Sequence, residues 1–314
     1  MTRFVVRRLL QSVVLLLGIT LITFTISHLA PGGPETLLED PTIPPEYLAR
    51  LRADYGLDQP LPVQYVRWVA NLANLNFGRS FEDNRPVLDK ILERVPATLE
   101  LSMSGLMLGL LGIPLGIQAA LHRGSAIDGF VRVFTVVGQS VPHWWLGLLI
   151  IIVTAPLGIF PLGGIADPDH PNDIASRLHH LVLPAVITAM TGWIVFSRYV
   201  RSELLEVLGH DYMRTARAKG LGRATAIRRH GLRNAFLPVI TLLSNPLSPL
   251  LSGAVLFETV FSWPGMGRLA VTAAFRRDYP TVMALTVLIA ALVILGNLIA
   301  DVAYGYADPR VRYD

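Results

Sequence analysis

The sequence contains no cysteine, few charged residues and only two lysines, Lys90 and Lys219. The absence of cysteine excludes disulfide frameworks, thiolate metal sites, iron–sulfur clusters and cysteine nucleophiles. Neither lysine follows a G-x-x-x-x-G pattern, so the chain has no P-loop with which to bind ATP. Charged residues make up 16% of the chain, against about 25% in a typical soluble protein. Apolar residues make up 52%, and the mean hydropathy of +0.48 indicates a membrane protein.

The sequence contains several long runs of apolar residues. A helix that crosses a bilayer core about 30 Å thick needs about 20 apolar residues, because its backbone groups must be paired within the segment. The first such run, Leu9 to Leu29, exceeds the apolar core of a cleaved signal peptide, so we expect a retained anchor. Five more runs follow: Ala97 to Leu121, Phe130 to Ala155, His179 to Tyr199, Ala235 to Phe257 and Pro280 to Ala303. The sequence therefore predicts an all-α integral membrane protein with six transmembrane helices.

Glycine and proline are frequent inside these runs. Glycines at intervals of three or four residues indicate close packing between membrane helices: Gly105, Gly109, Gly112 and Gly116. Membrane helices tolerate proline where neighbouring groups satisfy the freed carbonyls, and several runs contain it: Pro114, Pro142, Pro184, Pro246 and Pro249. Both features suit a bundle of helices packed within a bilayer.

Basic residues are distributed unevenly between the connecting loops. Residues 200–234, which we call the basic loop, contain eight of the 27 lysine and arginine residues: Arg201, Arg214, Arg217, Lys219, Arg223, Arg228, Arg229 and Arg233. Short cytoplasmic loops carry an excess of lysine and arginine. The basic loop and both termini are therefore predicted to be cytoplasmic.

The predicted organisation has four parts. They are the N-terminal tail and first transmembrane helix (1–29), a small extracytoplasmic subdomain (30–96), a five-helix transmembrane core that includes the basic loop (97–303), and a cytoplasmic tail (304–314). Within the extracytoplasmic subdomain we expect two helices, over residues 46–55 and 63–75.

The basic loop contains a short predicted helix. Asp211 lies near its start, where a carboxylate suits the helix dipole, and Gly220 is placed to cap its end. Ala216, Ala218 and Gly220 have almost no side chain, so another protein could approach the backbone closely. The remaining part, residues 223–234, is expected to form a second basic helix. From composition alone, the alternative is a solvated loop whose arginines only fix the topology.

The spacing within the basic loop matches a known signature. Residues 214–216 (Arg-Thr-Ala) are followed by Gly220, and Leu-Pro follows at 237–238. The chain here resembles the permease subunits of bacterial ABC importers, whose signature reads Glu-Ala-Ala, three residues, Gly and then Leu-Pro. The first two residues depart from that signature, but Arg-Thr-Ala-Arg-Ala-Lys-Gly-Leu is similar to the peptide and nickel branch of the family. Other segments are similar to the B-type dipeptide or oligopeptide permease of this branch: residues 55–65, 77–80, 95–101 and 307–313.

This resemblance implies a multi-pass permease in the bacterial inner membrane, which forms half of the path for di- or oligopeptides, or for nickel chelates. It implies a homologous second permease, two ATP-binding-cassette ATPases and an extracytoplasmic solute-binding protein as partners, and no nucleic acid. It also implies that the chain is not an enzyme and holds no cofactor, because ATP and magnesium bind to the ATPases. The signature helix of the family docks on the ATPase, which assigns these residues to coupling: Asp211, Tyr212, Arg214, Thr215, Ala216, Ala218, Lys219, Gly220 and Leu221.

The rival classes are an ion-coupled secondary carrier and a channel or other membrane scaffold. Carriers usually bury carboxylates at mid-membrane, whereas Glu258 and Asp301 lie near the ends of predicted spans, where we expect each to reach an interface. The uncharged polar residues deepest in the spans are Gln139, Ser140, Ser244 and Asn245. They either line a water-filled path or bond across helices, and the sequence favours neither interpretation.

Overall fold

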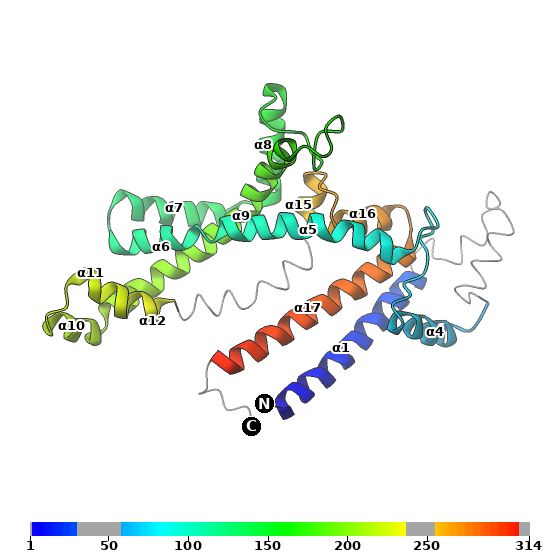
Figure 1. The fold of residues 1–314 in the computed structure, drawn as a ribbon, viewed down its shortest axis with the longest axis horizontal. Helices are drawn as coiled ribbons and strands as arrows, with labels where there is room; N and C mark the ends of the chain where they lie inside the picture. Colours follow the sequence, from blue (N-terminus) through cyan, green and yellow to red (C-terminus); the bar gives the residue numbers. More distant parts are fainter. Residues whose placement is uncertain (1, 30–57, 237–254, 308–314) are drawn as a thin grey trace. The chain divides into compact units, whose positions relative to one another are not determined.

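The computed structural model describes residues 2–29, 58–236 and 255–307, and its regular elements in these ranges are helices (Figure 1). Contacts divide the chain into two compact units. Unit 1 comprises Met1–Thr98, Leu251–Val255 and Pro264–Asp314, and unit 2 comprises Leu99–Leu250 and Leu256–Trp263. The all-α prediction is confirmed for the described residues.

Unit 1 is built around two long apolar helices that run side by side, α1 (Thr2–Leu29) and α17 (Tyr279–Ala307) (Figure 1). It also holds α4 (Leu61–Ala73), α16 (Met266–Phe275) and the first half of α5 (Val87–Gly109). A small core joins these elements through buried apolar side chains: Phe77, Val87, Ile91, Met266, Ala284 and Leu285. The apolar side chains of α1 between Val6 and Leu29 are mostly exposed, as expected of a helix that faces lipid.

The helix α4 confirms the expected second helix of the extracytoplasmic subdomain, since it covers Leu61–Ala73 and the prediction was 63–75. It contacts α1 through Tyr65, whose ring lies edge-on to that of Phe24 at 5.5 Å. A hydrogen bond of 3.0 Å also joins the hydroxyls of Tyr65 and Thr20. The other expected helix, over residues 46–55, lies outside the described residues.

Unit 2 is organised around the 36-residue helix α9 (Ile174–Gly209). Three helices pack against it: α6 (Gly112–Leu121), α7 (Ala126–Ser140) and α8 (His143–Thr154), which continues into a 3-10 turn, η1 (Ala155–Leu157). After α9 come α10 (Asp211–Ala218), α11 (Arg223–Ala226), the π-helical segment η2 (Ile227–Leu232) and α12 (Arg233–Ala235). The short helix α15 (Val255–Val260) belongs to this unit apart from its first residue.

The expected glycines bring helix backbones into direct contact. A Cβ built on Gly192 of α9 would lie 2.7 Å from the Cα of Gly109, and one built on Gly112 would lie 2.8 Å from the Cα of Trp193. On Gly116 it would lie 2.5 Å from the carbonyl oxygen of Ser197. Real Cβ atoms essentially never come this close, so no larger residue fits here without movement of a helix. The predicted role of these glycines in close helix packing is confirmed.

Four described helices are long and apolar enough to cross a membrane: Val6–Leu29, Val87–Leu121, Ile174–Gly209 and Tyr279–Ile299. A fifth candidate is a bent pair, Ala126–Ser140 with His143–Leu157, whose axes meet at 94°. The expected third span, Phe130 to Ala155, is therefore bent sharply between Ser140 and His143, and its crossing of the membrane stays a prediction. Proline disfavours helical backbone in the residue before it, and Val141 is accordingly extended, with φ −112° and ψ 127°. Most of the expected fifth span, residues 237–254, lies outside the described residues, so the total of six stays a prediction.

Candidate functional site

The predicted short helix of the basic loop is present as α10. The chain leaves α9 at Gly209, and His210 adopts an extended conformation (φ −69°, ψ 149°) that turns the chain into the new helix. The rings of His210 and Tyr212 stack with centroids 5.5 Å apart. The eight-residue helix α10 is thus separated from α9 by a single residue.

Gly220 closes α10, as the sequence predicts. Its φ of +86° lies in the left-handed region, where a residue with a Cβ is strained. The Gly220 amide donates to the carbonyl of Arg217 at 3.0 Å, and the Leu221 amide donates to the carbonyl of Ala216 at 3.3 Å. These two bonds form a Schellman motif, which satisfies carbonyls that the helix end would otherwise leave unpaired.

The two faces of α10 differ. Met213 and Ala216, one turn apart, are buried within the loop, whereas Arg214 and Ala218 are exposed. The structure therefore differs from the expectation that Ala216 lies on an open face of small residues, because this side chain points towards its own chain. The accessible face is formed by Asp211, Tyr212, Arg214, Thr215, Ala218 and Lys219.

Apolar contacts hold α12 against the end of α9, and one hydrogen bond joins α10 to α12. Leu204 and Val207 of α9 pack with Ala120 of α6 and Ala235 of α12 in one buried cluster. The side-chain amide of Asn234 donates to the Tyr212 hydroxyl at 3.2 Å. The expected second basic helix is present as the continuous run of α11, η2 and α12, and it returns to α9 through this cluster. The hydrogen bond and the cluster thus connect α10, through α12, with α9 and α6.

The basic loop has little internal charge compensation. Arg214 lies 3.4 Å from the carboxylate of Asp211, one turn earlier, and both side chains are strongly exposed. Exposed pairs of this kind contribute about 0–1 kcal/mol. Across residues 210–236 the sequence has seven lysine or arginine residues and one acidic residue.

The polar residues proposed to line a path are only partly within the described residues. Gln139 is exposed and accepts a hydrogen bond of 3.1 Å from Arg198. Ser140 donates to the carbonyl of Val136 at 3.0 Å, within its own helix. Ser244 and Asn245 lie outside the described residues. The role of these four residues in lining a path stays a prediction, and so does the alternative that they bond across helices.

Glu258 lies in α15 and is fully buried within the protein. Its expected position near a membrane interface stays a prediction. Its backbone carbonyl accepts a hydrogen bond of 2.8 Å from the Trp263 amide, which closes a tight turn after α15. The side chain of Asp301 lies outside the part of the structure that is described. Within the described ranges, no three histidine, aspartate or glutamate side chains lie close enough together to hold a metal ion.

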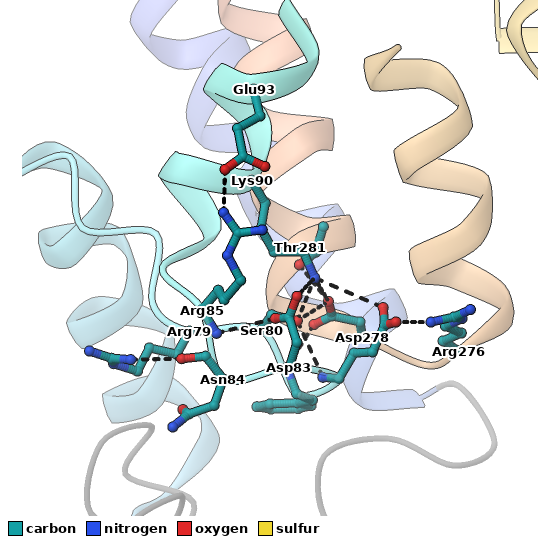
Figure 2. Close-up of polar contacts among 12 residues, drawn as sticks. Arg79, Ser80, Asp83, Asn84, Arg85, Lys90, Glu93, Arg276, Asp278 and Thr281 are labelled. Atoms are coloured by element: carbon teal, nitrogen blue, oxygen red, sulfur yellow. Dashed lines mark hydrogen bonds and ion pairs between the residues drawn. The ribbon is translucent and has the colours of Figure 1, made fainter. Parts of the chain in front are cut away.

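A polar cluster in unit 1 has no counterpart in the sequence analysis (Figure 2). Asp278 is fully buried just before α17, and its carboxylate accepts hydrogen bonds of 2.6 Å from the hydroxyls of Ser80 and Thr281. The Phe81 amide donates a third, at 2.9 Å. Lys90 of α5 lies 3.5 Å from the same carboxylate and donates to the Ser80 hydroxyl at 2.8 Å. This network, which we call the Lys90–Asp278 cluster, fixes the segment before α5 to the start of α17.

Acidic residues complete the surroundings of Lys90. The Asp83 carboxylate lies 3.1 Å from its ammonium group and the Glu82 carboxylate lies 3.9 Å away, while Arg276 pairs with Glu82 (Figure 2). Burial raises the pKa of Asp83, but hydrogen bonds from the Arg85 amide and from Lys90 outweigh it, so the pKa lies below its usual value. Glu82 and Asp83 are near Lys90 in the sequence, but no local pattern marks Arg276 and Asp278 as further members of the group, because these lie far along the chain.

Residues 112–313 match the family model of the binding-protein-dependent transport system inner membrane component, and residues 1–102 match the N-terminal region of such membrane components. The chain belongs to this family. The basic loop and Asp278 lie in the first matched range, and Lys90 lies in the second. The basic loop and the residues of the Lys90–Asp278 cluster thus all lie within the regions that match the family.

Three relatives are similar along essentially their whole length. The permease is 42% identical to the oligopeptide transport system permease protein AppB of Bacillus subtilis, with 100% of each chain covered. It is 39% identical to the di/tripeptide transport system permease protein DppB of Pseudomonas aeruginosa, covering 100% of this chain and 99% of the relative. It is 37% identical to the dipeptide transport system permease protein DppB of Escherichia coli K12, again covering 100% and 99%.

Family membership confirms the interpretation of the chain as a multi-pass component of the inner membrane, and as a permease rather than an ion-coupled carrier. A binding-protein-dependent system includes a solute-binding protein and an ATPase, so the permease has partners of both kinds.

Proposed function

We propose that the permease is one of two transmembrane subunits of an ABC importer for di- and oligopeptides in a bacterial plasma membrane. The peptide permeases of three bacteria, each similar along the whole chain, support a peptide substrate over a nickel chelate. The complete importer contains a homologous second permease, two ATPases and an extracytoplasmic solute-binding protein. Its subunits alternate between states open to either side of the membrane.

The proposed topology has six spans and places the basic loop and both termini in the cytoplasm. The excess of basic residues in the loop supports this orientation. Residues 30–96 then form an extracytoplasmic subdomain on the side of the binding protein, and residues 304–314 form a cytoplasmic tail.

The single observation that carries the coupling mechanism is the attachment of α10 to α9. The helix α10 presents an exposed face, is closed by Gly220, and is joined through one residue to a helix that crosses the membrane. The proposed docking residues are those of the signature stretch, with Met213 and Ala216 as internal supports. Closure of the ATPases then moves α10 and α9 together as a rigid body.

A glycine substitution tests the docking surface. Gly220→Asp places a carboxylate and a strained backbone at the end of α10, with no atom within 4 Å of the new Cβ. Gly158→Asp is the matched control, because Gly158 also has a positive φ (+62°) at a helix end with open space around it. We expect Gly220→Asp to insert normally but to lose the ATPases on co-purification, and Gly158→Asp to retain them. Equal retention by both variants would show that α10 does not dock the ATPases.

The energy source gives a second test. A conformational cycle is driven only by a ligand that binds its states with different affinity. The chain has no P-loop, so we expect that ligand to be ATP on the partner. Mutation of the P-loop lysine of the ATPases should abolish peptide uptake by reconstituted importer and leave assembly intact. Uptake driven by a proton or sodium gradient in permease without ATPases would contradict this mechanism.

A further inference from the structure

A hollow lies beside α10, between the end of α9 and α11, and its volume is 290 Å³. Apolar side chains of Leu208, Met213 and Ile227 line part of it. Three arginines, Arg214, Arg217 and Arg223, line the remainder. We refer to it as the arginine hollow. All of these residues belong to unit 2.

The charge of the arginine hollow is not neutralised within the described part of the chain. Arg214 has the exposed contact with Asp211 at 3.4 Å. Arg217 and Arg223 are exposed, and neither has an ion-pair or side-chain hydrogen-bond partner among residues 58–236 or the other described ranges. Guanidinium groups are planar donors that bind carboxylates with two parallel hydrogen bonds. The hollow is therefore suited to a carboxylate on an otherwise apolar segment, because docking of that segment against the apolar lining would remove water from the ion pair.

The position of the hollow favours a protein over a lipid headgroup. Ionisable residues begin on α9 at Arg198 and recur at Arg201, Glu203 and Glu206, which places the end of the hydrocarbon core near Tyr199. Leu208 follows nine residues later in the same helix, which is about 13 Å further along its axis. The headgroup layer on each side of a bilayer is roughly 5–8 Å thick. The hollow therefore lies beyond the headgroups.

We propose that the arginine hollow receives an acidic side chain, flanked by apolar residues, from the ATPase that docks on α10. This inference rests on the proposed function of α10, and it adds the polarity of the contact: the permease supplies arginine and the ATPase supplies the carboxylate. Charge complementarity of this kind speeds association and fixes the register of two surfaces.

The test uses the complete importer in nanodiscs of zwitterionic phosphatidylcholine. The variant Arg217→Gln with Arg223→Gln removes charge from the hollow. Its matched control, Arg228→Gln with Arg229→Gln, removes two exposed charges from η2 that do not line the hollow. Affinity for the ATPases is measured from their dissociation from the importer on dilution, at increasing sodium chloride concentration, after membrane insertion has been checked for each variant.

We expect the hollow variant to bind the ATPases at least about thirtyfold more weakly, with a flatter salt dependence, because a desolvated ion pair is lost. The control should change the affinity less than about threefold, as exposed charges do. Equal affinities for the two variants, together with a loss in Gly220→Asp, would overturn the hollow proposal and leave α10 docking in place. If Gly220→Asp also bound normally, the proposed docking function would fail as well.

A second set of measurements tests whether an anionic lipid headgroup, rather than the ATPase, supplies the negative charge. The same measurements are repeated in nanodiscs that contain anionic phosphatidylglycerol. We expect the deficit of the hollow variant in both membranes. A deficit that occurred only with the anionic lipid would overturn the proposal and assign the arginine hollow to a headgroup.

Discussion

The Lys90–Asp278 cluster and the basic loop use charge in opposite ways. In the cluster, Asp278 is fully buried, and its carboxylate accepts hydrogen bonds from Ser80, Phe81 and Thr281 and lies beside Lys90, all in the same unit. In the basic loop, the arginines of α10 are exposed, and within the described part of the chain only Arg214 has a weak ion-pair partner. Buried charges that lose a partner destabilise a protein strongly, whereas exposed charges contribute little to its stability. The cluster therefore stabilises the fold of its unit, whereas the charges of the loop are accessible to the partner that we propose.

The largest expected difference between the two regions is the side of the membrane from which each is accessible to a reagent. The chain has no cysteine, so single cysteines report one position each. We expect a membrane-impermeant thiol reagent to label Asn74→Cys, in the segment that leads to the cluster, in intact cells. Thr225→Cys, in α11, should be labelled only after the membrane is permeabilised. Labelling of Thr225→Cys in intact cells would reverse the proposed orientation.

The free energy of unfolding should depend on a charge in the Lys90–Asp278 cluster much more than on a charge in the basic loop. Lys90→Met leaves the buried Asp278 carboxylate without its cation, and we expect a loss of about 3–5 kcal/mol in the free energy of unfolding. Arg217→Met in α10 should change it by less than about 0.5 kcal/mol, because this side chain is exposed. Denaturant titration of the purified permease in detergent measures both values.

A double variant sharpens that result. Asp278→Asn combined with Lys90→Met leaves a neutral acceptor for the hydroxyls of Ser80 and Thr281, so much of the lost stability should return. Additive losses from the two substitutions would mean that the charges of Lys90 and Asp278 are not coupled.

Two threonines give a smaller contrast of the same kind. The Thr281 hydroxyl is buried and donates to Asp278 at 2.6 Å, whereas the Thr215 hydroxyl is exposed and donates to the Asp211 carbonyl at 3.1 Å. We expect Thr281→Val to cost about 1.5–3 kcal/mol, since its acceptor is charged. Thr215→Val should cost less than about 0.5 kcal/mol. Similar losses for both would show that burial does not distinguish the two regions.

The smallest effect concerns pH. The pKa of Asp83 is below the ordinary value of 3.8 in the folded protein, so its ionised form contributes stability above that value. This contribution is lost as the pH falls from about 4 through the folded pKa. Since Asp83 is 36% exposed, we expect Asp83→Asn to cost less than about 0.5 kcal/mol at pH 7, and progressively less as the pH falls below about 4. A cost that stayed constant through this fall in pH would assign the effect to packing.

Local patterns predicted much of the fold. Apolar runs located the helices, and the glycines of α5 and α6 indicated the close contact with α9 that the structure has. Gly220 was correctly assigned to a helix end because a left-handed residue after a helix is usually glycine. Each of these signals depends on residues near one another in the sequence.

The features that sequence analysis missed depend on distant residues or on small geometric differences. Lys90 and Asp278 come together only when α5 packs beside the start of α17. The sequence around either residue therefore does not predict the other as its partner. From the sequence, Pro142 could either be tolerated within one helix or break it. In the structure Val141 is extended, and the helices on either side meet at 94°. Ala216 was expected on an open face because its size permits close approach. The structure buries Ala216 instead, and the sequence of α10 alone does not contain that information.

The close contact between Gly109 and Gly192 gives α9 the geometry of a lever with a central fulcrum. Gly192 lies 18 residues after the start of the helix and 17 before its end, which is about 27 Å and 26 Å along the axis. A lever with nearly equal arms carries a displacement at one end to the other with the same size and the opposite sign. We therefore expect ATPase closure to move the two ends of α9 by similar distances, and paired spin labels near Asn172 and Gly209 can measure both movements. A displacement confined to the Gly209 end would mean that the helix bends at the contact instead of pivoting on it.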